Sequence, residues 1–292
     1  MSDTQDSDAP KKGSKAKKPQ ADDAADGADK LAVETFDATQ ADEKDAPPKK
    51  PLKARIVEEL KFFSTLAVVL LALLTGVWGH FKIPSESMLP TLEVGDHLYV
   101  SKFAYGYSKH SLPFGLHQIP GLPDGQIFTR VPKRGDVAVF RHPHEGIVMI
   151  KRVVGLPGDK ITMLHGRLYI NGTIVEREMI DSYLYRKHEG GHKAGVEVYE
   201  EKWAEEKRPH QIYEETDFGV LDNTETFEVP AGHIFFMGDN RDNSTDSRAS
   251  NGPGYVPFDH LMGRADLMMF SFKRCEKEEN LRCPPFRALI RL

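Results

Sequence analysis

Residues 136–170 read DVAVFRHPHEGIVMIKRVVGLPGDKITMLHGRLYI, and this stretch decides the fold. It holds several short runs rich in Val, Ile, Phe and Tyr, and each run is separated from the next by turn residues such as Pro-Gly-Asp. Runs of this kind are typical of β-strands connected by hairpins. Asn171-Gly172 follows directly and is itself a hairpin signal. The stretch therefore predicts a mostly β domain.

The same β-type character recurs on both sides of this stretch. It is seen in HLYVS at 97–101, in HIFFM at 233–237 and in LMMFSF at 267–272. Residues 175–230 are more polar and richer in Glu and Lys, which indicates a smaller inserted subdomain. We therefore expect one β domain over residues 83–292, with an insert at approximately 175–230.

The N-terminal part of the chain has a different composition. Residues 1–55 are rich in Asp, Lys, Ala and Pro, so they bury too little apolar surface to offset their ordering entropy, and we expect a disordered tail. Residues 62–81, FFSTLAVVLLALLTGVWGHF, contain no Asp, Glu, Lys or Arg. Because twenty helical residues rise about 30 Å, we predict one transmembrane helix within residues 56–82 and the lipid bilayer as a partner. A cleavable export signal is the alternative, but no small-x-small site follows the run.

Basic residues close to the apolar run lie mainly before it. They stand at five positions: Lys49, Lys50, Lys53, Arg55 and Lys61. Since basic flanks stay on the cytoplasmic side, we expect a single-pass protein of the bacterial inner (plasma) membrane. Its N-terminus would lie in the cytoplasm and its β domain outside, in the periplasm of a bacterium that has one. The net charge of −5 argues against a nucleic-acid partner.

Ser87 and Lys151 are the first candidates for chemistry. Ser87 follows the apolar run, and a serine hydroxyl is a weak nucleophile unless a base takes its proton. No histidine has a setting that marks it as this base, whereas Lys151 shares its strand face with Met149 and Val153. Apolar surroundings lower the pKa of a lysine and make it a usable base. The alternative is an edge-strand lysine whose stem covers apolar surface.

A polar loop is predicted at residues 238–248, GDNRDNSTDSR, directly after a strand. Its side chains are almost all hydrogen-bond donors or acceptors, so it is no core segment. A calcium loop is the alternative interpretation. However, the acidic residues do not follow the spacing of an EF-hand.

Four motifs follow the apolar run in a characteristic order: IPSESMLPTLEVGD, PKRGDVAVFRHP, IKRVVGLPGD and GDNRDNSTDSR. In this order they resemble the bacterial type I signal peptidases, also called leader peptidases. The resemblance implies a mostly β catalytic domain with a smaller inserted domain, behind a membrane anchor. It also implies a serine endopeptidase with a Ser/Lys dyad that cleaves signal peptides from exported preproteins after small residues at −1 and −3. No metal and no cofactor is implied.

The resemblance assigns a role to individual residues of this chain. Ser87 matches the acylating nucleophile and Lys151 the general base. Ser244 matches the hydroxyl that orients the lysine. Ser85 matches the hydroxyl that joins the Ser87 backbone N–H in the oxyanion hole.

Further positions match supporting and substrate-binding residues of the family. Asp246 and Arg248 match an ion pair that supports the polar loop. Four positions match residues that line the shallow apolar substrate pockets: Ile83, Met88, Leu92 and Ile150. Glu86 is a departure, since some members have Gly there, and we expect its carboxylate to point to solvent.

Two other sequence patterns do not indicate a functional site. His188-Glu-Gly-Gly-His192 matches the zinc motif HExxH, but adjacent glycines oppose the helix that this motif requires, so an exposed loop is predicted. Cys275 and Cys283 favour a disulfide over two free thiols in an oxidising compartment.

Two other functions remain open from the sequence. One is a self-cleaving, repressor-like protein with the same Ser/Lys chemistry, although the tail shows no helix-turn-helix pattern. The other is a catalytically silent, membrane-anchored protein that presents preproteins to a translocation partner. All candidate catalytic residues are present, so its silence would need a separate cause.

Overall fold

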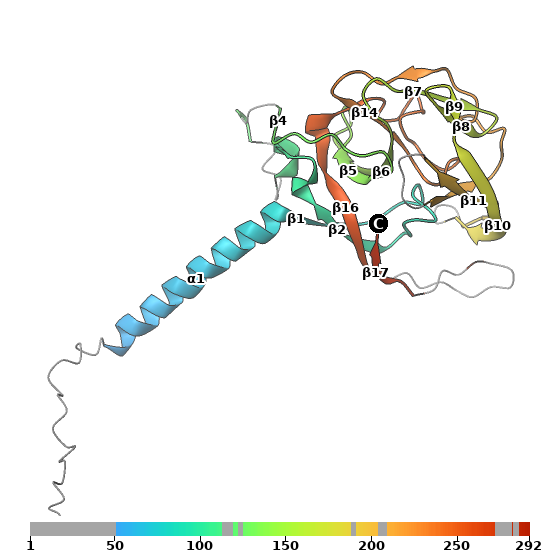
Figure 1. The fold of residues 1–292 in the computed structure, drawn as a ribbon. Coiled ribbons are helices and arrows are strands. Elements are labelled where there is room, and N and C mark those ends of the chain that lie inside the picture. The colour runs from blue at the N-terminus through green and yellow to red at the C-terminus, as the bar shows by residue number, and fades with distance from the viewer. Residues whose placement is uncertain are drawn as a thin grey trace, which may run out of the picture. The chain divides into compact units, whose positions relative to one another are not determined.

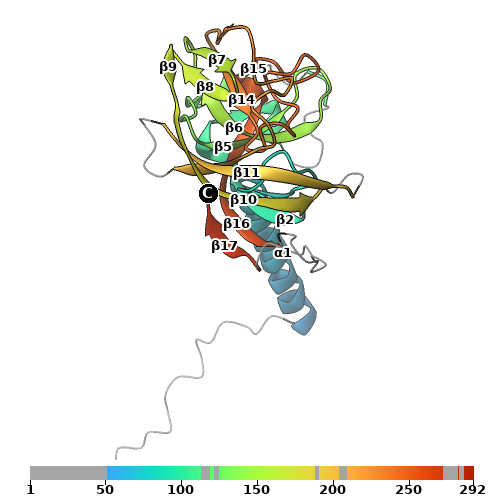
Figure 2. The same cartoon turned by 90° about the vertical axis from the view of Figure 1, so that its right-hand side faces the viewer.

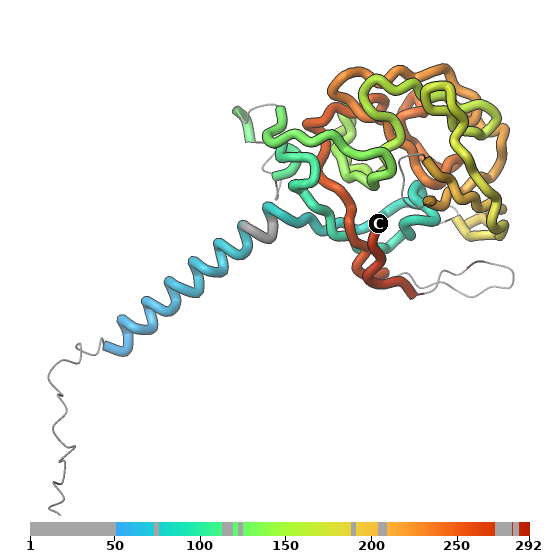
Figure 3. The backbone as a smooth tube through the Cα atoms, viewed as in Figure 1, coloured from blue at the N-terminus to red at the C-terminus, as the bar shows by residue number. Residues whose placement is uncertain are grey.

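The computed structural model describes residues 51–112, 119–121, 125–187, 191–203, 209–271, 282 and 286–292 (Figure 3). The predicted tail up to residue 50 lies outside the described residues. So do Cys275 and Cys283, and His188 to Gly190 of the zinc-type pattern.

The first described element is helix α1, Leu52–Val77. It begins within the residues predicted as tail and ends before the predicted boundary, because Trp78–Lys82 forms strand β1 and pairs with strand β2, Asp96–Ser101. The predicted transmembrane segment of residues 56–82 therefore needs correction. Among the residues that the structure describes, no helix is both long and apolar enough to cross a membrane.

The main sheet has eight strands and holds both ends of the β domain (Figure 1). Its order is β1-β2-β16-β5-β6-β14-β15, and β17 pairs with β16. The further strands are β5 (Val137–Arg141), β6 (Val148–Gly155), β14 (His233–Met237), β15 (Val256–Pro257), β16 (Leu261–Ser271) and β17 (Ala288–Arg291). Because β16 lies between β2 and β5, the C-terminal strands close the sheet against the N-terminal ones, as the red and cyan segments of Figure 3 show.

A second sheet contains the predicted hairpins. Its order is β13-β7-β8-β9, with β7 at Lys160–Leu164, β8 at Arg167–Ile170, β9 at Thr173–Ile174 and β13 at Phe227–Glu228. The β8–β9 turn is Asn171-Gly172, and both residues have positive φ, at 54° and 80°. This is the conformation that Asn-Gly favours in a two-residue hairpin.

A third sheet falls in the polar stretch of residues 175–230. It consists of β10 (Glu176–Arg186), β11 (Lys193–Lys202) and β12 (His210–Glu214). The long strands β10 and β11 run side by side in Figure 2. Strands β3 (Tyr107–Ser108) and β4 (Gln126–Ile127) form a fourth pair, and short 3₁₀ turns lie at Lys102–Ala104, Lys109–Ser111 and Phe258–His260. The fold is mostly β, as predicted.

The apolar core lies in several clusters between these sheets. One cluster packs the segment after β1 against the main sheet and includes Leu98 and Val139. A second fills the space around the β7–β8 hairpin and contains Phe235 and Trp203. Both β6 and β14 contribute buried side chains, so the strands that carry the site are held firmly in the core.

Candidate active site

Ser87 lies in the segment that joins β1 to β2. This segment is closed at its base, because Ile83 N–H donates to the Asp96 carbonyl at 2.9 Å and Gly95 N–H donates to the Ile83 carbonyl at 2.8 Å. A tight turn follows, in which Leu89 N–H donates to the Glu86 carbonyl at 3.0 Å. The side chain of Ser87 is thereby held in a largely buried position.

Lys151 lies on β6 and points toward Ser87. Its Nζ donates to Ser87 Oγ at 2.6 Å and to the Ile150 carbonyl at 3.1 Å. Strand β6 lies between β5 and β14, so the edge-strand interpretation is wrong. The lysine is 4% exposed, and burial lowers its pKa to about 8 even though Asp246 and Asp239 oppose this shift. The neutral form of this amine is therefore easier to reach near pH 7 than that of an exposed lysine.

Ser85 is the nearest second hydroxyl. Its Oγ lies 3.4 Å from Ser87 Oγ, and the residue itself is exposed. The two serines therefore flank the same space.

The polar loop at residues 238–248 is largely buried beside this space. Arg248 forms a two-pronged ion pair with Asp246 at 2.9 to 3.0 Å, and both side chains are fully buried. Asp246 also accepts the Gly238 N–H at 2.9 Å, so the pair fixes the start of the loop. The paired guanidinium lowers the pKa of Asp246 against the opposing effect of burial.

Ser244 is buried in the same loop, next to Asp246. Its hydroxyl contributes to the lowered pKa of Asp246. Within the described residues, it makes no hydrogen bond to Lys151, whose Nζ contacts Ser87 and Ile150 instead. The structure thus brings Ser244 to the site without the direct contact to Lys151 that its expected role would suggest.

A cavity of about 460 Å³ opens over Ser87 and Lys151. Its wall includes Ser85, Glu86, Met149, Lys187, His192 and Asn243. The four predicted pocket residues do not line it: Ile83, Met88, Leu92 and Ile150 pack together in the core cluster beneath the site. The cavity therefore gives access to a buried hydroxyl and a buried amine.

Residues 56–270 match the family model described as "Signal peptidase, peptidase S26". The chain belongs to the S26 family of signal peptidases. It is accordingly a serine peptidase, a hydrolase, and neither the silent binding protein nor the repressor is supported.

Several individual relatives are similar over most of their length. A signal peptidase I of Pseudomonas aeruginosa is 39% identical over 233 residues, which cover 77% of this chain and 75% of the relative. One of Rickettsia typhi is 35% identical over 230 residues, which cover 75% and 81%. The crystal structure of a signal peptidase I from Enterococcus faecalis is 26% identical and covers 46% of this chain and 97% of that one, with a TM-score of 0.28.

Asn240 is a residue of this S26 peptidase that the sequence analysis did not single out. Its backbone N–H donates to the Ser87 carbonyl at 3.1 Å, and its Nδ2 donates to the Glu86 carbonyl at 3.2 Å. It therefore holds the backbone carbonyls of Glu86 and Ser87 in place. The only sequence signal was its place in the polar loop, 153 residues beyond Ser87.

The side chain of Glu86 is not where the sequence analysis predicted it. It is 7% exposed, and its Oε2 accepts from Asn243 Nδ2 at 3.3 Å. The expectation of a solvent-facing carboxylate was wrong, because the polar loop covers this side of the serine segment.

A second buried ion pair lies next to Lys151. Arg152 donates to both carboxylate oxygens of Asp239, at 2.7 and 2.6 Å, and to the Gly135 carbonyl at 2.8 Å. Thr91 Oγ1 donates to the same carboxylate at 2.5 Å. Arg152 therefore ties β6 to the polar loop and to the segment that carries Ser87, a role that strand patterning alone does not reveal.

Proposed function

We propose that this chain removes signal peptides from exported preproteins, as a membrane-anchored serine endopeptidase with a Ser/Lys dyad. The observation that carries the proposal is the 2.6 Å contact between Lys151 Nζ and Ser87 Oγ in a buried site under an open cavity. The substrate class is supported by the signal peptidase I relatives of P. aeruginosa and R. typhi.

In this proposal the neutral amine of Lys151 takes the proton of the Ser87 hydroxyl. The serine oxygen then attacks the carbonyl carbon of the scissile peptide bond, and the leaving amine receives that proton from Lys151. An acyl ester forms on Ser87. Water next gives its proton to Lys151 and attacks the ester, which releases the signal peptide and restores the serine. The lowered pKa of Lys151, about 8, suits this cycle.

The developing oxyanion needs preorganised donors. The Ser85 hydroxyl and the Ser87 backbone N–H are the proposed pair, because Ser85 Oγ lies 3.4 Å from the nucleophilic oxygen. Ser244, Asp246 and Arg248 are proposed to hold the polar loop against the dyad rather than to touch substrate.

Selection of small side chains at −1 and −3 is proposed to depend on the core beneath the site. Met88 and Ile150 are the chain neighbours of Ser87 and Lys151, and they pack with Ile83 and Leu92 in one buried cluster. Because this cluster is already filled, the space above it would accommodate Ala or Gly more readily than larger side chains.

Helix α1 is proposed to attach the enzyme to the bilayer of the bacterial inner membrane. Its large apolar side chains are uncovered: Phe62, Phe63 and Val68 are 64%, 62% and 66% exposed. Exposed apolar surface of this extent fits lipid better than water.

Extraction of cell membranes with alkaline carbonate tests the proposed anchor. An anchored chain stays in the membrane pellet, whereas release into the supernatant would contradict the anchor.

The catalytic proposal is tested with purified full-length protein in detergent and a preprotein substrate. Wild type should cleave it, and Ser87→Ala and Lys151→Met should lose at least about 10³-fold in rate. Lys160→Met is the matched control, because Lys160 is an exposed strand lysine paired with Glu228. A Lys151→Met variant with wild-type rate would remove the proposed base, and failure of wild type to cleave any preprotein would overturn the function itself.

A further inference from the structure

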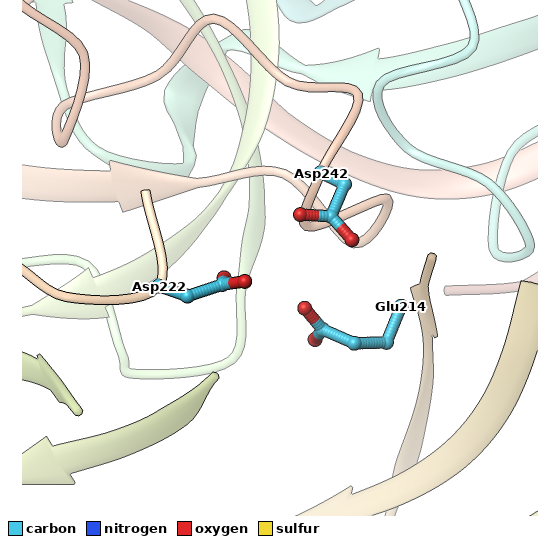
Figure 4. A group of neighbouring side chains, drawn as sticks. All are labelled: Glu214, Asp222 and Asp242. Carbon is cyan, nitrogen blue, oxygen red and sulfur yellow. The ribbon is translucent and has the colours of Figure 1, made fainter. Parts of the chain in front are cut away.

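Three carboxylates converge at a point outside the proposed catalytic pair (Figure 4). Glu214 ends strand β12, Asp222 lies in the segment before β13, and Asp242 belongs to the polar loop. One oxygen from each side chain lies within 4.8 Å of the others. We refer to Glu214, Asp222 and Asp242 as the acidic triad.

Two oxygens of the acidic triad have no hydrogen-bond partner among the described residues. They are Glu214 Oε1 and Asp222 Oδ1, and these two residues are 1% and 0% exposed. The second oxygens are engaged elsewhere, since Glu214 Oε2 accepts from Arg177 at 3.4 Å and Asp222 Oδ2 accepts the Gly219 N–H at 2.5 Å. A buried carboxylate oxygen without a partner is costly. A positive species held between the three carboxylates would remove this cost.

Three arginines lie near the acidic triad. Each is paired with a carboxylate outside the triad: Arg177 with Asp217, Arg241 with Glu201, and Arg248 with Asp246. Arg177 also pairs with Glu214 Oε2 at 3.4 Å, but its contact with Asp217 is shorter, at 2.6 Å, and neither Glu214 Oε1 nor Asp222 Oδ1 receives a hydrogen bond from an arginine.

We propose that the acidic triad binds a calcium ion through one oxygen of each carboxylate. Calcium takes carboxylate oxygens at about 2.3 to 2.6 Å, so two ligands on opposite sides of the ion lie up to about 5 Å apart. The 4.8 Å spread of the triad meets this limit. Calcium also tolerates irregular geometry, whereas magnesium demands a near-ideal octahedron.

An open cavity reaches the acidic triad at Asp242, whereas the buried Glu214 and Asp222 do not line it. A cavity of about 450 Å³ is lined by Asp242 together with Thr216 and Gly219. A side chain at Gly219 would fill this space, because its Cβ would lie 2.6 Å from Asp242 Oδ1 and 3.1 Å from Asp222 Oδ2. Glycine at this position therefore keeps the approach to the triad open.

A bound calcium would connect three separate segments. It would join the end of β12 and the segment before β13 to the polar loop, which also carries Ser244 and Asp246. The ion would thus stabilise the inserted strands against the loop beside the proposed site. This inference concerns binding alone, so it stands whether or not Ser87 and Lys151 are the catalytic pair.

Calcium binding is measured by titration calorimetry and thermal unfolding of the full-length protein in detergent, after treatment with EDTA and dialysis. Calcium chloride at about ten times Kd should raise the Tm of wild type by about 3 °C or more, at constant ionic strength. Glu214→Gln and Asp222→Asn should each weaken calcium binding by at least about tenfold. Glu225→Gln, an exposed acid of the same segment, should bind like wild type.

The wild-type measurement decides on its own whether calcium binds, and the variants locate the ion. No binding heat and no rise in Tm at millimolar calcium would overturn the proposal and leave a shared proton as the species between the carboxylates. Unchanged affinity in both triad variants would overturn it as well, because the ion would then lie elsewhere. An equal response to magnesium chloride would reject the choice of calcium.

Discussion

Lys151 Nζ donates a 2.6 Å hydrogen bond to Ser87 Oγ, and both side chains are more than nine-tenths buried. Only the neutral amine accepts the serine proton, and burial brings the pKa of Lys151 to about 8. We therefore expect kcat/KM to rise about tenfold per pH unit below this value and to level off above it. A pH profile of peptide cleavage measures this, with Lys160→Met as control. An inflection near 6.5 would instead indicate a histidine base.

The same lysine should cost the folded protein stability. Its folded pKa of about 8 lies below its ordinary value, so the unfolded chain holds this proton more tightly. The difference corresponds to roughly 3 kcal/mol at about 1.36 kcal/mol per pH unit. The penalty is complete below pH 8 and disappears as the pH rises toward about 10.4.

Lys151→Met should therefore unfold with a larger free energy than wild type. After the loss of its two hydrogen bonds, the expected gain at pH 7 is about 1 to 3 kcal/mol. Denaturant unfolding at pH 7 and at pH 10 measures it, and the gain should shrink at the higher pH. If Lys151→Met were less stable than wild type at pH 7, the buried amine would not destabilise the folded protein.

The sequence predicted the strands better than it predicted the first helix. Short runs of β-forming residues and the Asn171-Gly172 turn indicated the hairpins directly, because strand and turn chemistry are local. The end of α1 was misjudged because Trp78–Lys82 is apolar enough for a helix, yet it forms β1 through pairing with distant residues. Long-range pairing of this kind leaves no local signal.

The sequence likewise indicates some residues of the site and not others. Ser87 and Lys151 stand out because a serine after an apolar run and a lysine inside a β run are locally unusual. The sequence gives no such signal for Asn240 or for the buried position of Glu86, because their contacts join segments about 150 residues apart in the chain. The acidic triad likewise gathers three residues from separate segments, so no spacing rule such as that of the EF-hand could find it.

Asn240→Ala should lower activity through the backbone beside the nucleophile. The change removes one of the two donors of the Glu86 carbonyl, which keeps the Leu89 N–H, so the expected cost is about 0.5 to 1.5 kcal/mol. A small displacement of Ser87 follows, and we expect kcat to fall by about 10- to 100-fold. Steady-state cleavage kinetics measure this. Asn223→Ala, at an exposed asparagine, is the matched control. A stability loss with unchanged kcat would assign Asn240 a purely structural role.

Gly238→Ala tests how closely the polar loop approaches the nucleophile. A Cβ at this position would overlap both Ser244 Oγ and the carbonyl oxygen of Ser87, and a backbone carbonyl does not move without shifting its segment. We expect a stability loss of about 1 to 3 kcal/mol and a fall in kcat/KM of about 100-fold or more. Gly195→Ala is the control, because its Cβ would meet only Leu184, at an ordinary 3.6 Å. The folded variant would hold Ser87 away from Lys151, so a higher substrate concentration should not restore the cleavage rate. A variant that reaches the wild-type kcat at saturating substrate would contradict this account.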